Sequence, residues 1–69
     1  MRAEVPAVCL ELGRAAAALD MGLVFFEREV LPEVRVIRRG SKRLVPVEEL
    51  HRWARDNAQP TIARRSHAA

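Results

Sequence analysis

Residues 34–46 contain two short β-branched runs on either side of a strongly cationic turn. Residues 34–37 (VRVI) and 44–45 (LV) suit a pleated strand surface, and Gly40-Ser41 lies between them. Glycine reaches a positive φ at little conformational cost, so this pair is a good centre for a two-residue hairpin turn. The pattern predicts a β-hairpin whose tip carries four cations. They are Arg38, Arg39, Lys42 and Arg43.

Apolar residues at helical spacing predict two short helices before this hairpin. The first runs from Leu12 to Leu19, with an apolar stripe that includes Ala15 and Ala16. Cys9-Leu10 is expected to form a short extended lead into it that packs on the core. After a break at residues 20–22, the second helix runs from Leu23 to Val30, and Pro32 ends it.

The second helix has two contrasting faces. Gly22 is expected to act as its N-cap. Phe26 is the natural core anchor, and Leu23 and Val30 share its face. The opposite face carries two apolar side chains and one cation where solvent or a partner should lie, namely Val24, Phe25 and Arg28.

A third helix is predicted after the hairpin, from Val47 to Asn57. Pro46 stops the second strand and can open a helix at its first turn. The stripe of Val47, Leu50, Trp53 and Ala54 should face the core, and the Trp53 indole N–H then needs a hydrogen-bond acceptor. Arg52 is spaced to pair with Glu48, and Arg35 to pair with Glu33 or with a helix carboxylate.

Length and composition limit the classes of protein that this chain can represent. Sixty-nine residues support one thin core, because so short a chain buries only about 60% of its unfolded surface. The net charge of +3 favours polyanionic partners. Cys9 is the single cysteine, which leaves no intramolecular disulfide and no zinc-ligand set. No grouping of nucleophile and base, phosphate loop or metal spacing appears, so we expect no enzyme and no cofactor.

No apolar run approaches the roughly 20 residues that cross a membrane. The N-terminal residues lack the apolar centre of a signal peptide, so an intracellular location without a membrane partner is expected. The predicted fold class is α+β, a small winged helix-turn-helix of three short helices and a two-stranded hairpin wing. We expect a flexible arm over residues 1–9, the domain over residues 10–58 and a basic tail over residues 59–69.

The order of these elements and one string of residues resemble a known family. The string is LP followed by VRV, an arginine-rich turn, VP and finally EL-x-x-W, and it lies between Leu31 and Trp53. Over residues 10–57 the chain is similar to the excisionase-type, MerR-like winged-helix proteins of phages and mobile elements. Their second helix enters the major groove of DNA, and their wing lies along an adjacent minor groove or the backbone.

The resemblance implies duplex DNA binding. It implies an excisionase, or recombination directionality factor, that bends attachment-site DNA and directs integrase toward excision in the nucleoid of a bacterial cytoplasm. Integrase and neighbouring copies of the chain are the implied protein partners. A small transcriptional regulator of a phage or mobile element is the alternative within the same class. The implied DNA-binding residues are Gly22, Val24, Phe25, Arg28, Arg38, Arg39, Lys42 and Arg43.

The second helix departs from the family pattern. Gly22 replaces the usual Ser or Thr, and Val24 and Phe25 stand where polar residues are common. Arg28 is then the main candidate for reading guanine, and Val24 can meet a thymine methyl group. The alternative from another class is a protein-binding adaptor that uses the Val24 and Phe25 face.

Overall fold

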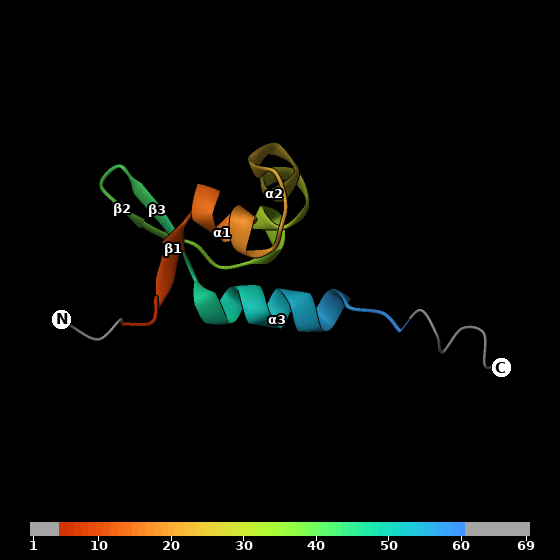
Figure 1. Cartoon of the computed structure of the whole chain (residues 1–69). Helices are drawn as coiled ribbons and strands as arrows, with labels where there is room; N and C mark the ends of the chain where they lie inside the picture. Colours follow the sequence, from red (N-terminus) through yellow and green to blue (C-terminus); the bar gives the residue numbers. More distant parts are fainter. Residues whose placement is uncertain (1–4, 61–69) are drawn as a thin grey trace, which may run out of the picture.

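The computed structural model describes residues 5–60 as three α-helices on a three-stranded antiparallel sheet, an α+β arrangement (Figure 1). Only Gln59 and Pro60 of the predicted basic tail, and residues 5–9 of the predicted arm, lie within this range. The elements in chain order are β1 (Cys9–Glu11), α1 (Leu12–Ala18), α2 (Leu23–Glu29), the 3₁₀ helix η1 (Leu31–Glu33), β2 (Ile37–Arg39), β3 (Lys42–Pro46) and α3 (Val47–Asn57).

The sheet has one strand more than the sequence predicted. Its order is β1-β3-β2, so β3 lies in the centre. Leu10 of β1 pairs with Val45 of β3, and the Val47 N–H extends the contact by donating to the Val8 carbonyl at 2.8 Å. The expectation of only two strands was therefore wrong, although the predicted hairpin is present as β2 and β3. The three residues of β1 carry no alternation of their own, and their partner lies far along the chain, so no local pattern showed the pairing.

The hairpin strands lie closer to the turn than predicted. β2 begins at Ile37 and β3 at Lys42, and Gly40 adopts a φ of 59° in the turn between them. Residues 34–36 do not pair in the sheet, because the Arg35 N–H donates to the Glu49 side chain on α3 instead. The four hairpin cations consequently belong to paired strands rather than to a loop.

The helices follow the predicted boundaries to within a residue. Asp20, with φ at 60°, turns the chain between α1 and α2, and Gly22 is the N-cap of α2 as expected. Val30 caps the other end of α2, and Pro32 sits in the first turn of η1, where its missing N–H costs nothing. α3 spans Val47–Asn57 as predicted.

The core lies between the three helices and the face of β3 that carries Val45. Phe26 is completely buried, which confirms it as the anchor of α2. Leu23 was predicted to join it but is 44% exposed, because side chains of a helix point toward its start and Leu23 is the first residue of α2. Ala54 is also exposed rather than core-facing. The buried residues are Leu12, Ala15, Ala16, Phe26, Val30, Val45 and Leu50.

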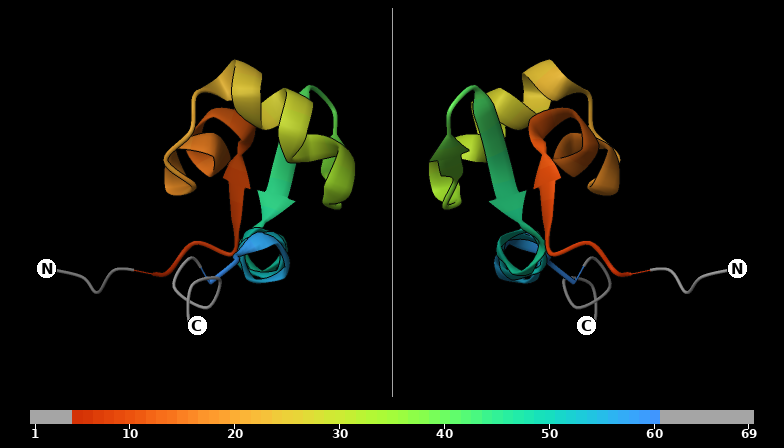
Figure 2. Two further views of the ribbon diagram at one scale, coloured as in Figure 1. Left: turned by 90° about the vertical axis from the view of Figure 1, so that its right-hand side faces the viewer. Right: turned by 90° about the vertical axis from the view of Figure 1, so that its left-hand side faces the viewer.

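The elements divide between two sides of the molecule. α3 runs along one side, while α2 and the turn of the hairpin lie on the opposite side in both directions of view (Figures 1 and 2). α1 and the sheet lie between them. Within residues 5–60, no helix has the length and apolar character needed to span a bilayer.

Candidate nucleic-acid interface

The hairpin divides its four cations between its two faces. In the register of the two antiparallel strands, Arg38 lies opposite Arg43, and Arg39 lies opposite Lys42. Since side chains alternate along a strand, Arg38 and Arg43 share the face of Val45, which is turned toward the helices. Arg39 and Lys42 lie on the other face. The four side chains are exposed, but they form two pairs rather than one cluster.

Two of these cations already contact carboxylates of the chain. Lys42 Nζ lies 3.2 Å from Glu11 Oε2, and Arg43 Nη2 lies 4.0 Å from Glu27 Oε2 on α2. Arg38 and Arg39 form no ion pair with any residue that the structure describes. These two guanidinium groups are therefore the freest positive charges on the hairpin.

The exposed face of α2 carries the other predicted site residues. Val24 is 72% exposed and Phe25 is 46% exposed. The Arg28 guanidinium carbon lies 5.5 Å from the centre of the Phe25 ring, and Arg28 Nε contacts Glu29 Oε2 at 3.1 Å. Gly22 has an ordinary φ of −71° and open space where a Cβ would lie. Nothing in the structure at this position requires glycine.

The predicted site residues thus belong to two elements, α2 with its cap and the β2–β3 hairpin, and α2 lies on the same side of the molecule as the hairpin turn (Figure 2). We name Gly22, Val24, Phe25 and Arg28 the α2 surface, and we name Arg38, Arg39, Lys42 and Arg43, which occupy both faces of the hairpin, the hairpin surface. The contact between Arg43 and Glu27 links the hairpin to α2. α2 and the turn of the hairpin lie opposite α3 (Figure 2).

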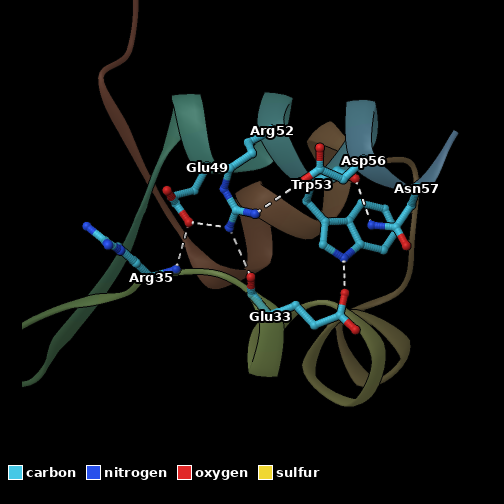
Figure 3. Close-up of polar contacts among 7 residues, drawn as sticks. All are labelled: Glu33, Arg35, Glu49, Arg52, Trp53, Asp56 and Asn57. Carbon is cyan, nitrogen blue, oxygen red and sulfur yellow. Dashed lines mark hydrogen bonds and ion pairs between the residues drawn. The ribbon is translucent and has the colours of Figure 1, made fainter.

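A polar cluster that the sequence did not reveal ties the base of the hairpin to α3 (Figure 3). The Trp53 indole N–H donates to Glu33 Oε1 at 2.8 Å. Arg52 donates to the Glu33 carbonyl at 3.0 Å and to Glu49 Oε1 at 2.8 Å, and the same Glu49 oxygen accepts the Arg35 N–H at 2.9 Å. Residues 33 and 35, which lead into β2, are therefore held against α3.

This cluster corrects two predicted pairs. Arg52 pairs with Glu49 and, at 3.3 Å, with Asp56 rather than with Glu48. Arg35 engages Glu49 through its backbone, whereas an ion pair of its side chain was expected. The spacing of charges on α3 predicted Glu48 as the partner of Arg52. Residues 33–35 lie beside Glu49 instead, so Arg52 and the Arg35 N–H both contact the Glu49 carboxylate.

The cluster also changes the acidity of its central groups. Hydrogen bonds from the Arg52 side chain, and then from the Arg35 N–H, hold the pKa of Glu49 below its ordinary value of 4.5. The hydrogen bond to Glu49 in turn raises the pKa of Arg52. Both shifts favour the charged forms, so the pair is ionised at neutral pH.

Among residues 5–60, no three His, Cys, Asp or Glu side chains gather into a group that could hold a metal ion. No family model matches the sequence, and no similar protein was found among curated proteins or solved structures. The geometry of the two surfaces and their charges is therefore the basis for assigning a function.

Proposed function

We propose that this protein binds duplex DNA, with α1 and α2 as a helix-turn-helix and the β2–β3 hairpin as a wing. The observation that carries the proposal is the exposure of Arg38 and Arg39 without a carboxylate partner among the described residues, on a hairpin whose turn lies on the same side of the molecule as α2 (Figure 2). Cations that repel one another in water gain free energy when they replace the counterions of phosphates. No catalytic role is part of the proposal.

The dimensions of α2 suit the major groove. An α-helix with its side chains is about 10–12 Å across, which fits a groove about 12 Å wide, and the seven residues of α2 supply about two turns of such a helix. The wing then follows the backbone beside it, and Arg38 or Arg39 can enter a narrow minor groove, where the negative potential is strongest. Binding of this kind reads the shape of the duplex as well as its bases.

The four wing cations do not contribute equally in this arrangement. Lys42 and Arg43 must exchange Glu11 and Glu27 for phosphates, so part of their gain is offset by the lost contact. Arg38 and Arg39 give up no such contact. The wing thus draws most of its affinity from the two arginines of β2.

The biological role that we propose is that of an excisionase, which bends attachment-site DNA and directs integrase toward excision. The resemblance of residues 10–57 to excisionase-type proteins supports this role. A small transcriptional regulator would use the same contacts. A circular-permutation gel assay measures whether the bound DNA is bent. Binding without a bend would contradict the excisionase role but not DNA binding itself.

The DNA-binding proposal is tested by removing single charges. We expect Arg38→Gln and Arg39→Gln each to weaken binding to a mixed-sequence duplex about tenfold, as for one lost charge-assisted contact of roughly 1.5 kcal/mol. Each should also reduce the slope of log K against log salt by about one. Arg55→Gln is the matched control, because it removes the same charge from α3 on the opposite side.

Equal losses in Arg39→Gln and Arg55→Gln would show that only net charge matters, which would overturn the proposed interface. Retention of full affinity in both wing variants at low salt would overturn DNA binding through the wing.

A further inference from the structure

The exposed apolar residues of α2 are successive in the sequence. Leu23, Val24 and Phe25 are 44%, 72% and 46% exposed, whereas Phe26, the next residue, is completely buried. Val24 and Phe25 each share a helix face with Arg28 at spacings of four and three residues. Because the N-terminal residues of a recognition helix are the ones that contact base edges, α2 is apolar where such contacts would form.

Every charged side chain of α2 already has a partner within the chain. Arg28 contacts Glu29 and lies over the Phe25 ring, and Glu27 contacts Arg43. A bidentate contact from Arg28 to guanine would require it to leave both Glu29 and the ring. The helix thus offers its apolar groups to a partner more readily than its donors and acceptors.

The major groove presents one apolar group, the C5-methyl of thymine. We propose, on the basis of the DNA-binding function proposed above, that Val24 and Phe25 recognise thymine by packing against its methyl group. Val24 is β-branched and therefore stiff at χ1, and the Arg28 guanidinium carbon lies 5.5 Å from the centre of the Phe25 ring, within range of a cation–π contact. Both side chains are exposed for contact, and the preferred site is rich in thymine rather than guanine.

Charge and size favour DNA over a protein as the occupant of this face. A standard protein interface uses about 20–30 residues on each side, and three side chains supply a small part of that. The cations of α2 and the wing outnumber the neighbouring carboxylates by five to three, which favours a polyanion. The cations are Arg28, Arg38, Arg39, Lys42 and Arg43, and the carboxylates are Glu11, Glu27 and Glu29.

The test compares thymine with uracil, which lacks only the methyl group. Duplexes are first enriched from a random library by the full chain, and the best-bound duplex is resynthesised with deoxyuridine at every thymine. We expect thymine at recurring positions and a loss of affinity of about fourfold for each methyl group contacted. Uracil leaves the minor-groove pattern unchanged, so contacts of the wing there do not produce the loss.

Two variants assign the effect to α2. Val24→Ala and Phe25→Ala should each bind the thymine duplex more weakly and the uracil duplex about as well as the original chain does. Both side chains are exposed, and circular dichroism checks that the variants fold. An exposed control, Ile37→Ala on β2, should keep the full thymine preference.

The outcomes separate this inference from the function on which it rests. Failure to bind any duplex at low salt overturns DNA binding itself. Binding without enrichment of thymine, equal affinity for the two duplexes, or unchanged discrimination in both α2 variants overturns the methyl contact and leaves DNA binding standing. The comparison of duplexes uses the unaltered chain, so it remains decisive even if a variant fails to fold.

Discussion

Arg38 and Arg43 lie directly opposite each other on the two strands of the hairpin, with their side chains on the same face. Like charges in this position repel, and the Glu27 carboxylate that could compensate lies 4.0 Å from Arg43. Arg39 and Lys42 repeat the arrangement on the other face, where Glu11 contacts Lys42. Each face of the hairpin thus holds a pair of like charges in which one member contacts a carboxylate and the other, Arg38 or Arg39, contacts none among the described residues.

Removal of one charge from the Arg38–Arg43 pair should stabilise the free protein. We expect Arg38→Gln to raise the free energy of unfolding by about 0.2–1 kcal/mol at low salt, because it removes a cross-strand repulsion. Urea denaturation measures the change. At about 1 M salt, where the Debye length is about 3 Å, the difference should nearly vanish. Destabilisation by this variant would contradict the repulsion.

The hydrogen bond from Trp53 to Glu33 should contribute to the attachment of η1 to α3. Trp53→Phe removes the indole donor, and we expect a loss of about 1–2 kcal/mol from the missing hydrogen bond and the smaller ring. Glu33→Gln is the matched control, since its amide oxygen can still accept the bond. Thermal unfolding of the three proteins checks the order, and equal loss in both variants would argue against a specific donor–acceptor contact.

Stability should fall in acid partly through Glu49. Its pKa is lower in the folded chain than its ordinary value of 4.5, so it binds a proton more readily when unfolded. Its contribution is therefore complete above pH 4.5 and is lost as the pH falls through the lower, folded value. We expect Glu49→Gln to be less stable than the original chain at neutral pH and the two to converge in acid.

The control for this pH dependence is Glu48→Gln on the same turn of α3. Glu48 makes no side-chain hydrogen bond to the described residues, so its removal should leave the acid-induced loss of stability intact. Urea denaturation across the acid range measures all three proteins. A constant gap between the original chain and Glu49→Gln at every pH would contradict the prediction.

Phe25 and Phe26 are adjacent but should respond oppositely to truncation. Phe26→Ala opens a cavity in the core and should cost about 3–5 kcal/mol, which approaches the whole stability of a domain of this size. Phe25→Ala removes a ring that is 46% exposed and should leave the fold intact. Circular dichroism with thermal melting distinguishes them, and unfolding of both would place Phe25 in the core.

The sequence predicted most of this fold because the informative signals were local. Helical spacing identified Phe26, Val30 and Leu50 as core residues, and Gly40-Ser41 located the turn. Gly22 was correctly predicted as a cap. These features depend on neighbours within a few positions, where periodicity and backbone preference act.

The errors arose where distant segments decided the outcome. β1 exists because β3 offers it an edge, and Leu10 and Val45 lie far apart in the sequence. Likewise, Arg52 contacts Glu49 because residues 33–35 pack beside these two side chains. The spacing of charges along α3 alone could not predict this contact. The division of the wing cations between two faces also followed from register, which short strands specify weakly.

Gly40 and Gly13 should respond in opposite ways to the same substitution. Gly40 has a φ of 59°, so Gly40→Ala places a Cβ in the left-handed region and should cost about 1–2 kcal/mol, although the space around it is open. Gly13 lies in α1 with no atom near a new Cβ, and Gly13→Ala should gain up to about 1 kcal/mol from reduced unfolded-state entropy. Gly40→Asn should recover much of the loss, since asparagine tolerates the left-handed region. Urea denaturation of the three variants gives the signs, and a stabilising Gly40→Ala would show that the hairpin turn has another conformation.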